Sequence, residues 1–456
     1  MKKNSFFYAM TAAATLLGVS ACSSENGTFT EEPAGAEDQV INIAVANDNS
    51  LSSRAGRPLE GSQPGQQIDI VKVVLTNSSD QVVWTKDVAW SAAQDYANGK
   101  KLTVVIPKTG ADSYDLQDGD YKVYAYGYAN ESDYTGLTDI PGTGEFKGDV
   151  VVTSQNLTGE EIFAGDKSFT WSDAEGADHN IALVLNRQVA GTFGYFSTIP
   201  YVVDEEGTPG QYLHLVASNP KKSIVLGNFS NADHANEASQ MFVNNGVGEA
   251  PESKILYTIN LNDWFSAITE KTEVVDGITV YKGVLDNSKW LAGGSDAETA
   301  KSKKFKKGSV FAGVFVNPFG KLNDGPVANS TLTLVLSTND NLTGKVREWT
   351  ITLPNGADQL SEHDLFSASA AEGAYTWASA KATDTRSVYS ILRNRLYTIG
   401  KRWNNDDHYN EGGTDPDPDP TPDPEHPDEP TPLNNTQELQ LLVNHNWEAI
   451  YSMGIE

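Results

Sequence analysis

The C-terminal residues ELQLLVNHNWEAIYSMGIE (438–456) alternate between apolar and polar side chains. Eight of the nine odd positions from 439 to 455 are apolar, against only two of the even positions from 440 to 454. A period of two is typical of a β-strand with one buried face, and the three-and-four spacing of a helix is missing. The stretch therefore predicts one long terminal strand. Its apolar face consists of Leu439, Leu441, Val443, Trp447, Ala449, Tyr451, Met453 and Ile455.

The segment before this strand, TDPDPDPTPDPEHPDEPTP (414–432), has a composition that cannot form a packed core. It holds eight of the chain's 20 prolines and seven of its 61 acidic residues, so extended polyproline II backbone is expected. At ~3.1 Å per residue such a spacer would span roughly 60 Å. Because a lone strand cannot bury an apolar face, we expect the terminal strand to insert into a sheet, either of its own domain or of a neighbouring molecule.

The rest of the mature chain is predicted to be all-β. Runs such as IDIVKVVL (68–75), YKVYAYGY (121–128) and STLTLVLS (330–337) recur between Gly, Asn and Asp residues, as in proteins built from short strands. Helical patterns are weak, and SAAQDYANGK (91–100) is the best candidate for a turn or two of helix. A chain of 456 residues is long enough for two or three domains. The strand spacing predicts two Greek-key sandwiches in tandem, divided near residue 186.

The N-terminus indicates an export signal. Lys2 and Lys3 precede an apolar run over 6–19, which at roughly 14 residues is too short to remain as a membrane-spanning helix. Cys22 follows Ser20-Ala21 and is the only cysteine of the chain. This arrangement resembles the bacterial lipobox, in which the thiol is diacylated and begins the mature chain. An ordinary secretory signal with a chance cysteine is the alternative.

A short strand and a candidate cleavage loop follow. Ile41, Ile43 and Val45 alternate in VINIAVAN (40–47), which predicts a strand. Between residues 22 and 71 the only basic residues are Arg54 and Arg57. Because Pro58 protects Arg57 from trypsin-like enzymes, the bond from Arg54 to Ala55 is the expected site of cleavage. The alternative is that Arg54 is an ordinary loop residue.

Composition and motifs exclude several classes of function. The chain has 33 basic and 61 acidic residues and a formal net charge of −28, which disfavours binding to nucleic acid or to anionic membranes. One cysteine permits neither an internal disulfide nor a thiolate metal cluster. The sequence has no GxSxG, HExxH or Walker motif. A non-enzymatic protein without cofactor or metal is therefore expected; Asp406, Asp407 and Glu411 could bind Ca²⁺, but a solvated loop is the simpler interpretation.

The order of these features resembles that of the fimbrillin family of type V pilins, and most closely its minor-fimbrium shaft subunits. The order comprises the lipobox Cys22, the strand 40–46, the Arg54-Ala55 site, two β domains, an acidic proline-rich spacer and an alternating terminal strand. SVYSILRNRLYTIG (387–400) is similar to a late motif of that family, and LVLNRQVAG (183–191) is similar to its inter-domain segment.

The resemblance implies a domain plan and a mechanism of assembly. It implies transthyretin-like sandwiches, an outer-membrane lipoprotein precursor, an Arg-specific surface protease that cuts after Arg54, and donor-strand exchange into an extracellular fimbrium that supports adhesion and biofilm. The partners would be further copies of the chain and other anchor and tip subunits. The plan is a signal peptide (1–21), a lipidated propeptide (22–54), two sandwiches (55–186 and 187–408), a spacer (409–432) and a donor strand (433–456).

Two other functions stay open at this stage. A non-polymerising surface lipoprotein that binds glycans would need exposed aromatic side chains, and the candidates are Trp84, Trp90, Trp171 and Trp290. A secreted hydrolase could use a pair of carboxylates, although no pair is distinguished by the sequence.

Overall fold

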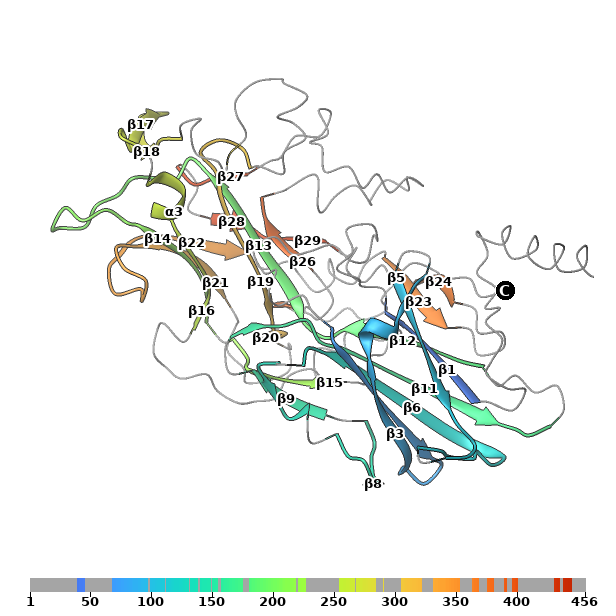
Figure 1. The fold of residues 1–456 in the computed structure, drawn as a ribbon. Helices are drawn as coiled ribbons and strands as arrows, with labels where there is room; N and C mark the ends of the chain where they lie inside the picture. The colour runs from blue at the N-terminus through green and yellow to red at the C-terminus, as the bar shows by residue number, and fades with distance from the viewer. Residues whose placement is uncertain are drawn as a thin grey trace, which may run out of the picture.

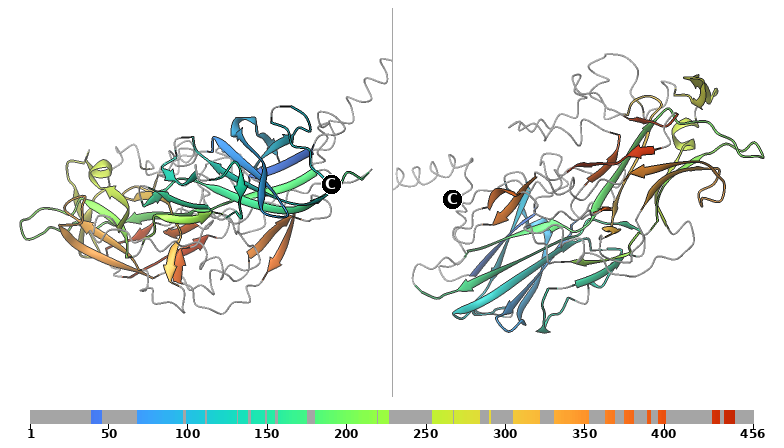
Figure 2. Two further views of the ribbon diagram at one scale, coloured as in Figure 1. Left: turned by 90° about the horizontal axis from the view of Figure 1, so that it is seen from below. Right: turned by 180° about the vertical axis from the view of Figure 1, so that it is seen from behind.

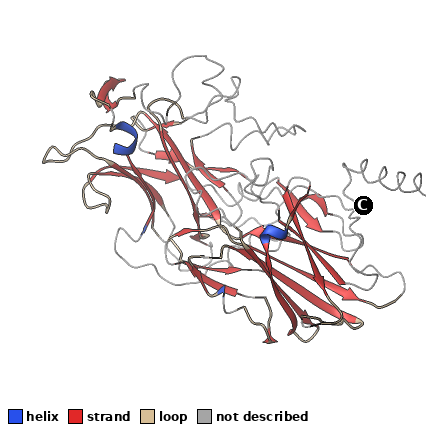
Figure 3. Cartoon of the chain, viewed as in Figure 1, coloured by secondary structure: helices blue, strands red, loops and turns tan. Residues whose placement is uncertain are grey.

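In the computed structural model, the regular secondary structure of the described residues consists almost wholly of β-strands (Figures 1 and 3). It describes residues 39–45, 68–226 and 254–283, apart from short gaps within the last two ranges. It also describes 290, 305–321, 331–352, 363–368, 375–380, 389–391, 396–400, 430–434 and 438–444. The described helices are the 3-10 turn Trp90–Ala92 and the single turn α3 (Asn262–Phe265). The prediction of an all-β fold is confirmed.

A nine-stranded sheet forms the N-terminal half, in the order β4-β5-β1-β12-β11-β6-β2-β3-β8. Its strands are β1 (Gln39–Val45), β2 (Ile70–Asn77), β3 (Gln81–Ala89), β4 (Gln94–Tyr96), β5 (Gly99–Ile106), β6 (Gly119–Tyr128), β8 (Gly144–Glu145), β11 (Phe163–Trp171) and β12 (Asn180–Arg187). The β2–β3 turn is closed by Asn77, whose side-chain oxygen accepts hydrogen bonds from the backbone N–H groups of Ser79 and Gln81. Such Asx turns favour hairpins.

The nine-stranded sheet turns over at β12 and so forms a sandwich. β12 pairs with β1 along 180–185 but with β11 only at Asn186 and Arg187. The inward side chains of β5, β1 and β12 pack against those of β2, β6 and β11 in one apolar core. This core contains Ile41, Ile43, Leu102, Val104, Leu183, Val71, Val73, Val123, Phe163 and Trp171.

The second half contains two further sheets that face one another. One has the order β10-β19-β13-β26-β29, with β27 also on β13, and the other has the order β16-β14-β21-β22-β28. The strands of the first are β10 (Thr158–Gly159), β13 (Ala190–Ser197), β19 (Val310–Val316), β26 (Leu396–Ile399), β27 (Thr431–Pro432) and β29 (Leu442–Asn444). Those of the second are β14 (Tyr212–Ala217), β16 (Ile255–Asn260), β21 (Leu332–Ser337), β22 (Lys345–Thr352) and β28 (Glu438–Gln440).

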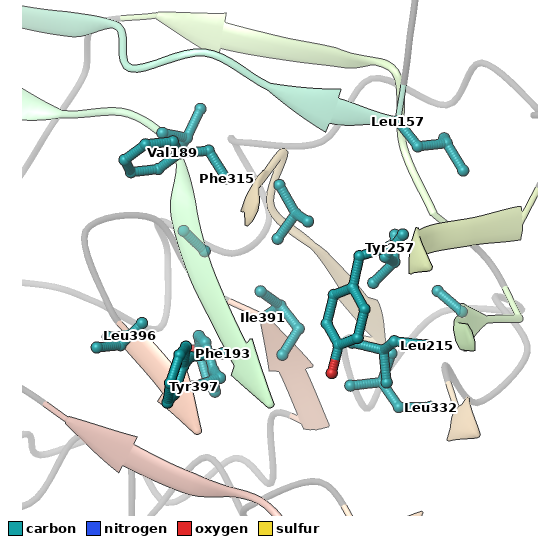
Figure 4. Close-up of a cluster of buried hydrophobic side chains, with 14 of the residues drawn as sticks. Leu157, Val189, Phe193, Leu215, Tyr257, Phe315, Leu332, Ile391, Leu396 and Tyr397 are labelled. Atoms are coloured by element: carbon teal, nitrogen blue, oxygen red, sulfur yellow. The ribbon is translucent and has the colours of Figure 1, made fainter. Parts of the chain in front are cut away.

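The core between these two sheets is dominated by large side chains (Figure 4). Phe193, Phe315 and Tyr397 come from one sheet, and Leu215 and Leu332 come from the other. Burial of each such side chain contributes about 1.5–3 kcal/mol before ordering costs. This core is the main source of cohesion of the second half.

Small sheets complete the fold and join the two halves. β9 (Val150–Ser154), β7 (Tyr134–Thr135) and β15 (Ser223–Leu226) form one, and β17 (Thr272–Val275) and β18 (Ile278–Tyr281) form a hairpin whose strand β17 is mostly exposed and whose residues Val280 and Tyr281 are buried. The remaining pairs are β20 (Phe319–Lys321) with β25 (Tyr389–Ile391), and β23 (His363–Ala368) with β24 (Tyr375–Ala380). The halves interleave, because β15 pairs with β9 and β10 pairs with β19 (Figure 2).

The chain passes from β12 of the nine-stranded sheet to β13 of the second half between Arg187 and Ala190. Buried polar groups stabilise the structure at this crossing. The Arg187 Nε donates a hydrogen bond to Glu161 Oε1 over 2.7 Å, and both side chains are less than a twentieth exposed. Nearby, the Tyr134 hydroxyl donates to Asn317 Oδ1 over 2.6 Å, and burial raises the pKa of this hydroxyl. Fully paired buried groups of this kind fix a single local arrangement.

One local prediction is wrong. Residues 91–100 do not form a helix beyond the 3-10 turn, because 94–96 form β4 and 99–100 already belong to β5. The two strands pair with one another, Gln94 opposite Lys101. A tight hairpin at the edge of a sheet satisfies the backbone here where a short, weakly patterned helix would have little apolar surface to bury.

Candidate strand-exchange site

Strand β1 lies inside a sheet although it comes from the N-terminal end of the described chain. It pairs in parallel with β12, from Val40 opposite Asn180 to Val45 opposite Leu185. On its other side it pairs antiparallel with β5, from Gln39 opposite Ile106 to Val45 opposite Lys100. Both edges of β1 are therefore occupied along its length (Figure 1). We call the space between β5 and β12 that β1 fills the β1 slot.

The apolar face of β1 contributes to the core of the first sandwich. Ile41 and Ile43 have no exposed surface, and they lie in the same apolar cluster as Leu102 and Val104 of β5 and Leu183 of β12. At about 1.5–3 kcal/mol for each buried isoleucine, the strand adds several kcal/mol to the gross stability of this core. Two of the three predicted strand residues thus have the inward position that the alternation indicates; the side chain of Val45 lies outside the described residues.

A buried glutamine fixes the beginning of β1. The Gln39 side chain has no exposed surface. Its Nε2 donates to the carbonyl oxygens of Ile106, at 3.2 Å, and Tyr114, at 2.9 Å. Its Oε1 accepts from the backbone N–H of Leu116 at 2.8 Å. One side-chain amide therefore joins β1 to the end of β5 and to the loop that follows β5. The sequence alone does not predict this role of Gln39, since its only signal there is a polar side chain in phase with Ile41 and Ile43.

Loss of β1 would divide its sheet. β12 would lack a partner along 180–185, because its contact with β11 is confined to two residues. β5 would lack its partner along 100–106 and would keep only the short strand β4. Two unpaired strand edges and an uncovered apolar core form a surface that strongly favours the addition of another strand.

The other N-terminal residues predicted to have a role lie outside the described residues. They are Cys22, Arg54 and Ala55, together with the whole connection from 46 to 67 between β1 and the described start of the following segment. The lipidation and cleavage predictions therefore stay predictions. The connection still has one chemical consequence, since a cut at any point between 46 and 67 would leave β1 held to the sandwich without a covalent bond.

The beginning of the predicted terminal strand lies on the chain's own second sandwich. β28 pairs in parallel with β22, from Thr350 opposite Glu438 to Thr352 opposite Gln440. β29 pairs antiparallel with β26 at 442–444. Leu439 and Leu441 are both buried, at 2% and 3% exposure. The tail thus covers the edges of two sheets, and the chain changes sheet at Leu441.

This placement differs from the single unbroken strand expected over 439–455. The physical reason is that β22 and β26 each offer a sheet edge to which three residues of the tail can pair. In the single chain, Leu439 and Leu441 are therefore engaged, and donation to a neighbour requires that they leave these edges. The side chain of Val443 is not described. Trp447, Ala449, Tyr451, Met453 and Ile455 lie outside the described residues.

The residues that a glycan platform would need are not on the surface. Trp84, Trp90, Trp171 and Trp290 are between 1% and 8% exposed. The indole N–H of Trp84 donates to the carbonyl of Asp112 at 2.8 Å, and that of Trp290 donates to the carbonyl of Ser309 at 2.6 Å. All four tryptophans are buried like core residues, and the indole N–H groups of Trp84 and Trp290 are satisfied by main-chain carbonyls. The glycan-binding alternative therefore loses the side chains on which it depended.

Within the described part of the chain, His, Cys, Asp and Glu side chains do not gather in groups that could hold a metal ion. The Ca²⁺ candidates Asp406, Asp407 and Glu411 lie outside it. None of the described helices is both long enough and apolar enough to pass through a bilayer.

Known protein families and curated sequences give no match to this chain. Among solved structures, a fimbrial assembly protein from Parabacteroides distasonis is similar with 11% identity and a TM-score of 0.34, over 80% of this chain and 91% of that chain. The fimbrial anchor protein Mfa2 from Porphyromonas gingivalis is similar with 12% identity and a TM-score of 0.30, over 68% of this chain and 81% of that chain. Overlaps this loose carry no inference, so the function proposed below rests on the chain's own residues.

Proposed function

We propose that this chain is a non-enzymatic structural subunit of a surface fimbrium, the shaft of which forms by exchange of β-strands between copies. The observation that carries the proposal is the position of β1: the strand fills the middle of a sheet, yet it lies upstream of the Arg54-Ala55 bond. A single proteolytic cut would make the first sandwich dependent on a strand that is no longer part of its chain.

The N-terminal sequence supports export to the cell surface. A lipobox-like Cys22 would anchor the precursor to the outer membrane through its acyl chains, and residues 23–38 would act as a polar tether. Cutting after Arg54 would separate this anchored piece, which includes β1, from the rest of the molecule. The protein would then leave the membrane and become part of an extracellular fimbrium.

Cleavage changes the thermodynamics of the β1 slot. While β1 is joined to β2 through residues 46–67, its effective concentration at the slot is in the millimolar range. After the cut, β1 is an ordinary bound peptide that can dissociate and be diluted. An empty slot would expose Leu102, Val104 and Leu183 together with two unpaired strand edges, and such surfaces aggregate unless another strand covers them.

A strand from a second copy is the proposed replacement. The slot lies in the first sandwich, whereas the candidate donor is at the opposite end of the sequence, so the contact between copies is heterologous. A heterologous contact that does not close produces an open filament. The partners are thus further copies of this chain, an Arg-specific surface protease, and anchor and tip subunits at the ends. The filament would support adhesion and biofilm formation.

The proposal is tested with lipid-free precursor, residues 23–456, treated with an Arg-specific protease. We expect a protein beginning at Ala55 and a ladder of SDS-resistant polymers. Arg54→Ala should remain monomeric under the same treatment, and Arg57→Ala, the matched control, should behave as the unsubstituted precursor does. Equal polymerisation of Arg54→Ala, or a cut protein that stays monomeric, would exclude this mechanism.

A further inference from the structure

Hydrogen bonds to one buried side chain, that of Gln39, can select the register of the strand that fills the β1 slot. Apolar side chains alone would tolerate a shift of β1 by two residues, because such a shift keeps the same face inward. The amide of Gln39 does not tolerate it. Its three hydrogen bonds go to main-chain groups of Ile106, Tyr114 and Leu116, which stay in place when the strand moves. A strand in another register would leave the buried carbonyl of Ile106 and N–H of Leu116, and the part-buried carbonyl of Tyr114, without this partner, at a cost of about 1–3 kcal/mol for each buried group.

The C-terminal segment contains a stretch whose order of polar and apolar residues resembles that of β1. Residues 39–45 read QVINIAV, and residues 437–443 read QELQLLV. In this alignment a glutamine is followed, on the same face, by a branched aliphatic residue at two positions and then by valine. The third position after the glutamine, which alternation places on the opposite face of the strand, carries an amide residue in both segments, Asn42 and Gln440. Two positions differ in character: Val40, which is only 8% exposed, corresponds to Glu438, and Ala44 corresponds to Leu442. The replacement therefore requires that the long side chain of Glu438 carry its carboxylate past a nearly buried position into water.

We infer that residues 437–443 of a second copy replace β1 in the slot, in the register that places Gln437 where Gln39 lies. Leu439 and Leu441 then take the places of Ile41 and Ile43, and Val443 takes that of Val45. The Gln437 amide donates to the carbonyl oxygens of Ile106 and Tyr114 and accepts from the N–H of Leu116. This inference rests on the proposed function and adds the register of the donor strand and the residue that sets this register.

The two available positions of the tail differ in how fully its backbone is paired. On its own sandwich the tail pairs at three residues with β22 and at three with β26, one side at a time, with a change of sheet at Leu441. In the slot, a strand is paired with β5 and β12 on both sides along most of its length. The same leucines are buried in both places. The transfer therefore exchanges two short edge pairings for one central strand, which favours the slot once β1 has left.

Cysteine pairs in the lipid-free precursor test the register. This precursor has no natural cysteine, because Cys22 is the only one in the chain. Asn42 lies opposite Thr103 of β5, so Asn42→Cys with Thr103→Cys should form a disulfide within the uncut precursor and serves as the positive control. After cleavage, Gln440→Cys with Thr103→Cys should give disulfide-linked multimers. The competing register, with Trp447 in the place of Ile41, is tested by Glu448→Cys with Thr103→Cys.

Each outcome of the cross-linking experiment either supports or overturns the inferred register. Multimers linked through position 440 but not 448 support the inference. SDS-resistant polymers that are linked through 448, or through neither position, would overturn the register while leaving the proposed function intact. A bridge from 440 within one chain would show that the tail fills its own slot and would overturn the assignment to a second copy. If none of the cut proteins polymerises, the proposed function fails and this inference fails with it.

A second pair of variants isolates the amide. We call the hydrogen bonds of the Gln39 amide to Ile106, Tyr114 and Leu116 the Gln39 clamp. Gln437→Leu removes the amide that would take over this clamp, whereas Gln440→Leu makes the same change three residues later, at a position that alternation places on the opposite face of the strand. We expect polymers of Gln437→Leu to dissociate in SDS at least tenfold faster than unsubstituted polymers, and those of Gln440→Leu to dissociate within about twofold of them. Equal dissociation rates for the two variants would show that Gln437 does not occupy the Gln39 position.

Discussion

Substitution of Gln39 by leucine measures how firmly β1 is held. The change introduces an apolar side chain of similar size and removes every hydrogen bond of the Gln39 clamp. The carbonyl of Tyr114 and the N–H of Leu116 would lose the partners that the structure shows for them, at about 1–3 kcal/mol each. We therefore expect the free energy of unfolding of the first sandwich to fall by about 2–5 kcal/mol. For a domain of this size this corresponds to a melting temperature lower by roughly 5–15 °C.

The assay is thermal unfolding of the lipid-free precursor, followed by calorimetry at neutral pH. Gln94→Leu is the matched control, because Gln94 is exposed on β4 of the same sheet; its melting temperature should stay within about 2 °C of the unsubstituted protein. Gln39→Glu tests the same hydrogen bonds through their pH dependence. A carboxylate cannot donate to the two carbonyls, so Gln39→Glu should be less stable than Gln39→Leu at pH 7. Its stability should recover as the pH falls and the carboxyl is protonated. A melting temperature for Gln39→Leu equal to that of Gln94→Leu would refute the role given to the clamp.

Three further predictions concern the second half and the crossing. Replacing Glu161 by Gln should cost about 3–5 kcal/mol, because it removes the carboxylate that pairs with the buried guanidinium of Arg187; a loss below 1 kcal/mol in denaturant unfolding would contradict this. The Tyr257 hydroxyl is buried beside Leu215 and Leu332 and has no hydrogen-bond partner among the described residues (Figure 4), so Tyr257→Phe should raise stability by about 1 kcal/mol, and a loss would show that a partner exists. Burial lowers the pKa of His214, so its contribution to stability is complete above pH ~6.5 and is lost as the pH falls through the lowered value. The slope of stability against pH in that acidic range should be reduced in His214→Gln, and an unchanged slope would assign it to other groups.

The all-β character was predictable because period-two alternation is local. IDIVKVVL (68–75) and YKVYAYGY (121–128) became β2 and β6 with only small changes at their ends. The strand 40–46 was found for the same reason, and Ile41 and Ile43 point inward as the alternation indicates. Each of these features depends only on neighbouring residues, which is why a single sequence contains enough information to find them.

The pairing of the strands with one another could not be predicted from the sequence. β1 pairs with β5 and β12, about 60 and 140 residues away along the chain, and no local pattern encodes which distant edge a strand will join. The tail shows the same limit, because its alternation predicts a strand but does not reveal that the chain crosses from β22 to β26 at Leu441. The Gln39 clamp could not be predicted either, because its partners are backbone groups within 106–116. Every residue has such groups, so the sequence does not distinguish the ones that bind Gln39.

Filaments grown from the cut precursor can be examined by electron cryomicroscopy and helical reconstruction, which would reveal the strand that lies between β5 and β12. The reconstruction should show a continuous strand between β5 and β12 that connects to the second sandwich of an adjacent subunit, with a glutamine side chain at the position of Gln39. Filaments in which residues 39–45 still fill that position, or in which subunits touch only through their outer surfaces, would contradict the account.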